Sequence, residues 1–232
     1  MLIHIFFEKK YISLQNRLMI KMKHLLIIGA RGWGRETYSL AQKCIGYGTD
    51  FDIKGFLDDN TTALDGFSGY PTIIDSVEEY EPEQDDVFIC ALGDAQWKKH
   101  YVGIMQAKSA HFISLIHKKS YIGKNTKIGV GCIVSNDVCI SCDVSIGDFV
   151  TFQRLVDIGH DAIIGNYCHL GSDSFMGGYS QIGNETTVHT KGIVLPHIKV
   201  GNNCLVGAGA VVIRQVKDGN TVYGNPAKIL KY

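Results

Sequence analysis

The sequence lacks an excess of charge of either sign, and it lacks any long apolar run. Its 232 residues include 23 lysines and arginines and 23 aspartates and glutamates, so the formal net charge is zero. A balanced chain does not favour nucleic acid or an anionic membrane surface as its main partner. No apolar run approaches the roughly 18 residues that a membrane-spanning helix needs, so we expect no membrane insertion.

Cysteine is present, but its placement argues against a metal or disulfide framework. Of the seven cysteines, Cys132, Cys168 and Cys204 occupy the same small inward position of the sequence repeat described below. Cys139 and Cys142 form the closest pair, and we predict no zinc site there. We therefore interpret the cysteines as structural thiols of a protein from a reducing, cytoplasmic compartment.

A repeat of six residues dominates the second half of the chain. At every sixth position from Ile122 to Val212 stands Ile, Val, Leu, Met or Phe, and the phase never shifts. The residue four positions after each of these is small or β-branched, as at Thr126 and Cys132. Such a short fixed period is typical of a solenoid whose coils share one core. A glycine often follows the aliphatic residue, which suits the turn between faces. We predict a left-handed parallel β-helix over residues 118–232.

The first half of the chain shows a different pattern. Residues 1–21 do not look like part of the fold, and we interpret them as an extension without assigned function. From residue 22 on, short buried strands alternate with helical stretches, which favours a small α/β domain of Rossmann type over residues 22–117. The predicted strands cover 25–28, 51–57, 70–74, 87–91 and 111–116, and the predicted helices cover about 35–44 and 95–107.

Three loops of this domain are expected to meet at one edge, because ligands of parallel α/β sheets bind beyond the carboxyl ends of the strands. They are Gly29–Gly34, Asp58-Asp59 and Gly93-Asp94. The first loop can present backbone N–H groups and a helix N-terminus to a phosphate. Its glycine order is G-x-x-G-x-G, so a nicotinamide dinucleotide is not indicated. The aspartates can accept hydrogen bonds from a ribose or a base, although acids are also ordinary turn formers.

The histidines of the repeat region raise two kinds of chemistry. His160, His169, His189 and His197 could suggest a zinc site between subunits, but no two of them have the five-residue spacing of the γ-class carbonic anhydrases. We predict no metal. His160 is followed by Asp161 and is expected on the outward side of the coil. A histidine oriented by an adjacent carboxylate can act as a general base, although a surface histidine without a role is also common.

These features together resemble one known family, that of the sialic-acid O-acetyltransferases and UDP-4-amino-sugar N-acetyltransferases of the NeuD/PglD type. The resemblance covers the chain from about Met22 to its end. The motifs that carry it are the loop Gly29–Gly34, Phe56-Leu-Asp-Asp59, Leu115-Ile-His-Lys118, His160-Asp161 followed by His169, and Gly224-Asn-Pro-Ala-Lys228.

The resemblance implies a homotrimer that transfers acetyl directly from acetyl-CoA to a sugar amine or hydroxyl. By it, His160 is the base, Asp161 increases its basicity, and His169 contacts the coenzyme. The remaining expected contacts fall into two groups. By the resemblance, the coenzyme groove lies between neighbouring β-helices and is lined by Gly178, Thr190 and Ala208. The residues expected to bind the nucleotide part of the substrate are Arg31, Gly32, Trp33, Asp58, Asp59 and Gly93.

This chain departs from the family pattern at the acceptor end. It has Trp33 where the glycine loop usually carries histidine, Gly159 where the base is often preceded by glutamate, and Gln153 where relatives can carry asparagine. The leading hypothesis is acetylation of the amino group of an amino sugar or UDP-amino sugar in surface polysaccharide or glycan synthesis. Acetylation of a sialic acid or another sugar hydroxyl, and a non-catalytic trimeric scaffold, are the alternatives.

Overall fold

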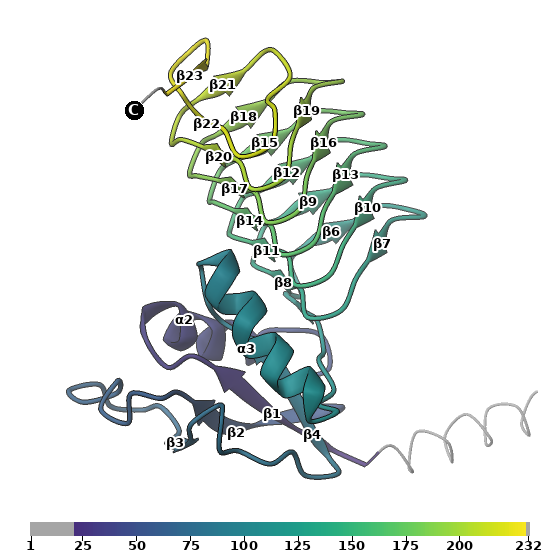
Figure 1. The fold of residues 1–232 in the computed structure, drawn as a ribbon. Helices are drawn as coiled ribbons and strands as arrows, with labels where there is room; N and C mark the ends of the chain where they lie inside the picture. Colours follow the sequence, from purple (N-terminus) through teal and green to yellow (C-terminus); the bar gives the residue numbers. More distant parts are fainter. Residues whose placement is uncertain (1–20, 231–232) are drawn as a thin grey trace, which may run out of the picture.

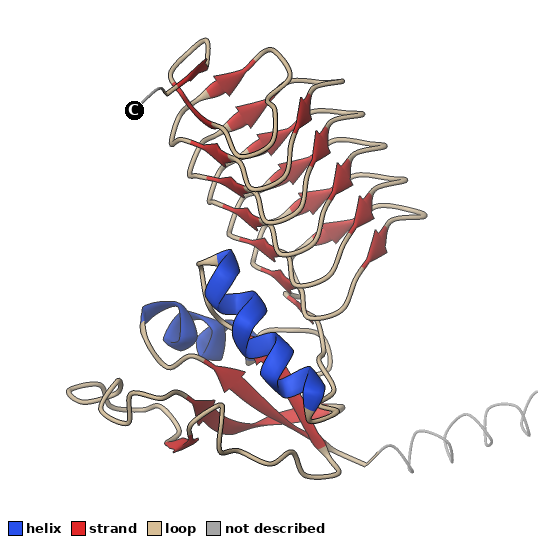
Figure 2. Cartoon of the chain, viewed as in Figure 1, coloured by secondary structure: helices blue, strands red, loops and turns tan. Residues whose placement is uncertain are grey.

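The structure is a computed structural model that describes residues 21–230, so the predicted extension lies almost entirely outside the described residues. Figure 1 shows an N-terminal α/β domain at the foot of a tall stack of coils. Figure 2 shows that both described helices belong to this N-terminal part, whereas the stack consists of short strands joined by turns.

The N-terminal domain is built on a parallel sheet of four strands in the order β3-β2-β1-β4. The last four residues of the central strand β1 are apolar and fully buried, because the sheet is covered on both faces. The elements are β1 (Lys23–Ile28), α2 (Gly32–Ala41), β2 (Phe51–Leu57), β3 (Ile73–Asp75), β4 (Asp86–Cys90) and α3 (Ala95–Ala107).

Several elements differ from their predicted bounds, and the strand predicted at 70–74 is the shorter β3, which begins at Ile73. Helix α2 begins at Gly32 rather than Arg35, because the glycine loop turns directly into the helix. Residues 111–116, predicted as the last strand of the N-terminal domain, divide between both parts of the chain. Phe112 forms an isolated bridge to Phe88, whereas β5 (Leu115–Ile116) pairs with the coil above it. Strand β5 is thus the first strand of the β-helix, because Leu115 pairs with and packs against Ile133 of the next coil.

The second half is the predicted left-handed parallel β-helix. Neighbouring rungs are 18 residues apart, as Asp148 and Asn166 are, so each coil contributes one strand to each of three faces. The first face holds β5, β8 (Ile133–Val134), β11 (Thr151–Phe152), β14 (His169–Leu170), β17 (Thr187–Val188), β20 (Leu205–Val206), β22 (Thr221–Tyr223) and β23 (Lys228–Ile229). The second holds β6 (Tyr121–Ile122), β9 (Cys139–Ile140), β12 (Asp157–Ile158), β15 (Phe175–Met176), β18 (Ile193–Val194) and β21 (Val211–Val212). The third holds β7 (Lys127–Ile128), β10 (Ser145–Ile146), β13 (Ile163–Ile164), β16 (Gln181–Ile182) and β19 (Lys199–Val200).

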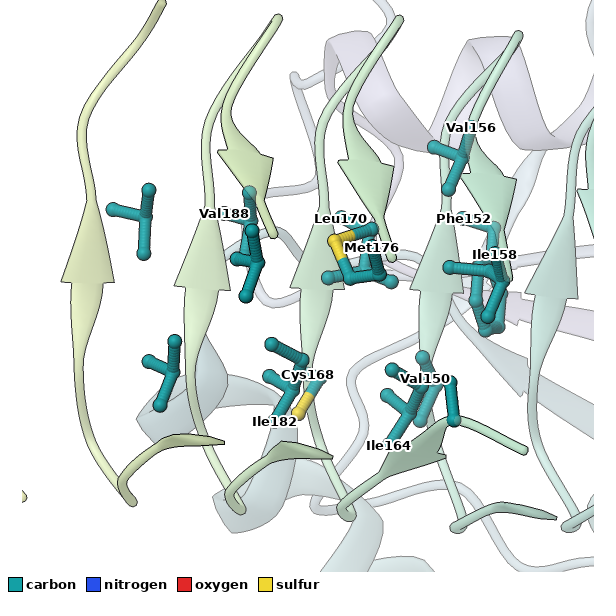
Figure 3. Close-up of a cluster of buried hydrophobic side chains, with 14 of the residues drawn as sticks. Val150, Phe152, Val156, Ile158, Ile164, Cys168, Leu170, Met176, Ile182 and Val188 are labelled. Carbon is teal, nitrogen blue, oxygen red and sulfur yellow. The ribbon is translucent and has the colours of Figure 1, made fainter. Parts of the chain in front are cut away.

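The faces meet at three corners, which we number by the faces they join. In the coil that starts at β11, corner 1–2 is 153–155, corner 2–3 is 159–161 and corner 3–1 is 165–167. The repeated aliphatic residues point inward and form a column along the axis, as Ile158, Leu170 and Met176 do in Figure 3. All three are fully buried, so the hydrophobic effect fixes the phase of the repeat.

The glycine after each aliphatic residue has a different role from the predicted one. The left-handed backbone at each corner belongs to the residue two positions later, as at Asn125, Asp161 and Asn203, with φ between 52° and 61°. The glycine itself lies where two coils approach closely. A Cβ on Gly165 would lie 2.6 Å from the backbone nitrogen of Asn184, closer than real Cβ atoms come.

Corner 3–1 carries a ladder of asparagines that links one coil to the next. The backbone N–H of Asn166 donates to Oδ1 of Asn184 at 2.8 Å, and that of Asn184 donates to Oδ1 of Asn202 at 2.9 Å. Inside the same corner, the thiols of Cys132, Cys168 and Cys204 donate to backbone carbonyls of the coil above. Burial raises the pKa of the Cys168 thiol to about 12, so it stays protonated, in keeping with a packing role.

The N-terminal domain is docked on the first face through α3. Lys98 is 2% exposed, and its Nζ donates to Oγ1 of Thr151 at 2.9 Å and to the carbonyl of Phe149 at 3.2 Å. Burial lowers the pKa of this amine. Beside it lies His169, whose ring meets the Trp33 indole edge to face at 6.4 Å between centroids. Burial, together with the charge of Lys98, lowers the pKa of His169 to about 4, so this imidazole is neutral at pH 7.

The close approach of the coils predicts a large effect of one added methyl group. We expect Gly165→Ala to lower the free energy of unfolding by about 1–3 kcal/mol, because the coils must move apart. Gly103→Ala is the matched control, since Gly103 is exposed within α3 and nothing lies within 4 Å of its added Cβ. That change should raise stability by about 0.5–1 kcal/mol. Denaturant unfolding at one fixed protein concentration measures both, and equal effects would contradict the role of Gly165.

The buried His169 predicts a pH-dependent stability. The unfolded chain takes up a proton near pH 6.5, while the folded chain does so near pH 4, so stability falls as the pH drops through this window. Relative to His169→Gln, the wild-type protein should lose about 2 kcal/mol more between pH 7.5 and pH 5. Unfolding curves of both proteins at the two pH values test this, and parallel losses would show that His169 is not held neutral.

Candidate active site

A pocket of about 670 Å³ opens at the carboxyl edge of the N-terminal sheet, where the three predicted loops converge. Five of the six residues expected there line it, and Gly32 instead faces a second cavity beside α2. The five are Arg31, Trp33, Asp58, Asp59 and Gly93.

The two aspartates of this pocket are partly committed to the fold. Asp58 accepts hydrogen bonds from the backbone N–H groups of Ala30 at 2.7 Å and Asn60 at 2.9 Å, so it braces the glycine loop. Asp59 accepts from the hydroxyl of Tyr101 and from the backbone of Val77. Burial acts to raise the pKa of Asp59, but these hydrogen bonds outweigh it and lower that pKa. The Asp59 carboxylate is thus held ionised, and the hydrogen bonds hold both side chains in fixed positions.

An aromatic ledge at the mouth of the pocket was not predicted from the sequence. It consists of Trp97, which is 59% exposed, and Tyr101, whose ring stacks on the indole with centroids 6.0 Å apart. Asp94 caps α3 and accepts from the backbone N–H of Trp97 at 2.9 Å, which fixes the first turn of the helix. A flat exposed ring beside a polar pocket can stack on a nucleobase. In the sequence, the only signal for this ledge was an aromatic residue in the first helical turn after Gly93-Asp94.

The predicted base lies on corner 2–3 of the β-helix. Nδ1 of His160 is 2.8 Å from Oδ2 of Asp161, and both side chains reach solvent. A carboxylate can only accept, so Nδ1 carries the proton and Nε2 is free to receive another. Asp161 has a left-handed backbone with φ of 58°, a conformation that aspartate adopts more readily than most residues. The turn thus aims the carboxylate at the ring.

His160 and His169 do not meet within one chain. His160 is on corner 2–3, whereas His169 is on the first face, which lies opposite that corner in a three-sided coil. The N-terminal domain covers the first face, so its pocket lies on the side of His169 and away from His160. The two halves of the predicted site are therefore on opposite sides of the same coil.

The residues expected to line the coenzyme groove also divide between two corners. Gly178 lies one coil above His160, and a Cβ on it would come within 3.0 Å of Nε2 of that ring. Thr190 and Ala208 lie on corner 1–2, directly above Ser172 in successive coils. Beside Ser172, a groove of about 1080 Å³ runs between corner 1–2 and α2.

Within residues 21–230, no group of three or more histidine, cysteine or acidic side chains is placed to hold a metal ion. Cys139 and Cys142 have C-x-x-C spacing, but Cys139 is exposed on strand β9 and Cys142 lies at the following corner. Over the same described residues, no helix has the length and apolar character needed to cross a membrane.

Known proteins share both parts of this architecture. Residues 24–104 match the PglD N-terminal domain family. GDP-perosamine N-acetyltransferase of Escherichia coli O157:H7 is 25% identical over 216 residues, which span 88% of this chain and 95% of that relative. The alignment therefore covers both the N-terminal domain and the β-helix.

Solved structures agree with this. The acetyltransferase domain of PglB from Neisseria gonorrhoeae FA1090 is 27% identical, with a TM-score of 0.82 over 90% of this chain and 100% of that one. PerB from Caulobacter crescentus, solved with CoA and GDP-perosamine, shares the fold at 24% identity, with a TM-score of 0.80 over 90% of this chain and 97% of that one. The chain therefore carries a PglD-type N-terminal domain at residues 24–104, and over most of its length it is similar to acetyltransferases that combine such a domain with a β-helix.

Proposed function

We propose that the protein is an acetyl-CoA-dependent N-acetyltransferase that acts on the amino group of a nucleotide-linked amino sugar. The observation that carries this is the His160–Asp161 pair, exposed on a β-helix whose relatives are named acetyltransferases. A relative that aligns over nearly its whole length is named for a GDP-linked amino sugar, so GDP-sugars join the UDP-sugars expected from the sequence. The PglB domain has been solved with acetyl coenzyme A, which supports the same coenzyme here.

The geometry supports direct transfer. The amine nitrogen of the acceptor attacks the thioester carbonyl carbon, while Nε2 of His160 takes a proton from that nitrogen. Asp161 holds the ring through Nδ1 and stabilises the imidazolium that forms. The tetrahedral intermediate then breaks its bond to sulfur, and His160 returns the proton to the leaving thiolate. The products are the amide and CoA, and the base is regenerated.

The nucleotide is assigned to the pocket of the N-terminal domain. Its glycine loop and the N-terminus of α2 offer backbone N–H groups to the phosphates. Trp97 and Tyr101 offer a stacking surface for the nucleobase. The ionised Asp59 can accept a hydrogen bond from a ribose hydroxyl or from an N–H group of the nucleobase. The amino sugar then extends toward Trp33 and the groove beside corner 1–2.

The placement of the base supports an assembly of several chains, which we propose to be a homotrimer. Because His160 is on the corner opposite the covered first face, a neighbouring chain must bring its corner 2–3 to this pocket. The same arrangement would join Gly178 of one chain with Thr190 and Ala208 of another around a single coenzyme. The acetyl group would thus be transferred between two β-helices.

Removal of the base tests the reaction. His160→Ala should lower kcat by about 10²–10⁴-fold, because a general base is lost. His111→Ala is the matched control, since this exposed histidine lies in the N-terminal part away from both cavities. Thiol release from acetyl-CoA is followed with GDP- and UDP-linked 4-amino sugars and with a sialic acid. Full activity of His160→Ala would refute the mechanism, and turnover with the sialic acid alone would favour O-acetylation.

Mixing two defective variants tests the shared site. Asp58→Ala combined with Trp97→Ala should raise the KM for the nucleotide sugar and leave that for acetyl-CoA unchanged. When this variant is co-refolded with His160→Ala at equal amounts, about a quarter of the sites should combine a wild-type pocket with a wild-type base from the neighbouring chain. Activity at a low sugar concentration should therefore exceed that of either variant alone. No recovery would mean that each chain supplies both parts.

A further inference from the structure

The side chain of His160 is 55% exposed, and three neighbouring residues fix its surroundings. Asp161 binds Nδ1, and two residues of the coil above contact the rest of the ring. These are Gly178 and Tyr179, which follow His160 and Asp161 by one 18-residue coil. The coils are joined here by the backbone, since the N–H of Tyr179 donates to the carbonyl of His160 at 2.9 Å. The position of the upper coil over the ring is thus fixed by the ladder itself.

Gly178 leaves the space in which the ring lies. A Cβ at this position would be 3.0 Å from Nε2 of His160 and 3.1 Å from Cε1. The φ of Gly178 is outside the left-handed region, so the backbone would accept alanine, but the His160 ring would have to shift by a few tenths of an ångström. The tightest contact falls on Nε2, the nitrogen that must receive the proton. A side chain here would displace the ring or cover that atom.

Tyr179 sets the plane of the ring. Its ring lies at 90° to the imidazole, with centroids 5.2 Å apart, and it stacks on His197 of the next coil at 5.0 Å and 6°. A single hydrogen bond through Nδ1 holds one atom of the imidazole but leaves the ring able to rotate about that bond. An edge-to-face neighbour, itself held by a stacked ring, removes this freedom.

We infer that Gly178 and Tyr179 are positioning residues for His160, which together keep Nε2 uncovered and aimed outward from corner 2–3 toward the acceptor. This inference rests on the proposed role of His160 as the base. It gives Gly178 a role toward the base, whereas the family resemblance points to a coenzyme contact. A small loss of alignment between a base and its proton is costly, because the reaction depends on near-attack geometry.

The inference is tested first at Tyr179. Tyr179→Leu should lower kcat about 10-fold with little change in either KM. Tyr179→Phe keeps the ring, so this variant should retain most of the wild-type kcat. Made in the His160→Ala background, Tyr179→Leu should cause no further loss, because there is no ring to position. A loss of equal size in that background would overturn the inference, as would a raised KM for acetyl-CoA with unchanged kcat.

The second test is Gly178→Ala, which should lower kcat by about 10–100-fold and again have no effect once His160 is alanine. An unchanged melting temperature shows that the variant is folded. If Gly178 serves the coenzyme alone, the KM for acetyl-CoA rises and kcat does not fall, which contradicts the inference. Failure of the proposed function would look different, since His160→Ala would then itself remain active.

Discussion

The structure depends on the close approach of consecutive coils. Backbones can come this near because glycine follows most of the inward aliphatic residues, as at Gly123 and Gly165, where a Cβ would meet the coil above. The hydrogen bonds between coils then repeat without a register shift along the stack. With the register fixed, residues 18 positions apart become neighbours throughout the coils below the last one, in which Leu205 pairs with Thr221. Two of the three contacts around His160 arise in this way, because Gly178 and Tyr179 belong to the coil above.

The same rigidity explains why one chain separates the two halves of the site. The N-terminal domain is fixed to the first face by the buried Lys98 and by the packing of Trp33 on His169. Turning that domain toward corner 2–3 would expose an amine whose hydrogen bonds lie within the interface, at a substantial cost. The separation between the pocket of the N-terminal domain and His160 of the same chain is therefore built into the fold. In the proposed mechanism, a second chain brings the base to the pocket.

Much of this could be predicted from the sequence, for identifiable reasons. The hexapeptide period is set by burial, so it revealed the β-helix, and the three polar loops were correctly placed at one sheet edge. The separation of His160 from His169 was also available, since nine residues are half of an 18-residue coil. Trp97 and Lys98 were not predictable. In sequence, an exposed tryptophan and a buried lysine look like ordinary residues of an amphipathic helix, and only the docking of α3 distinguishes them.

The uniform coil has a further consequence for how such a chain can change. Adjacent strands of the β-helix are about 4.8 Å apart, so the number of coils sets the distance of a residue from the N-terminal domain. Insertion or loss of one whole coil below His160 would keep the residue on its corner but shift it by one rung relative to the domain. A six-residue insertion would move it to another corner altogether. A whole coil can therefore be added or lost without moving His160 relative to the N-terminal domain only beyond the site, toward the C-terminus.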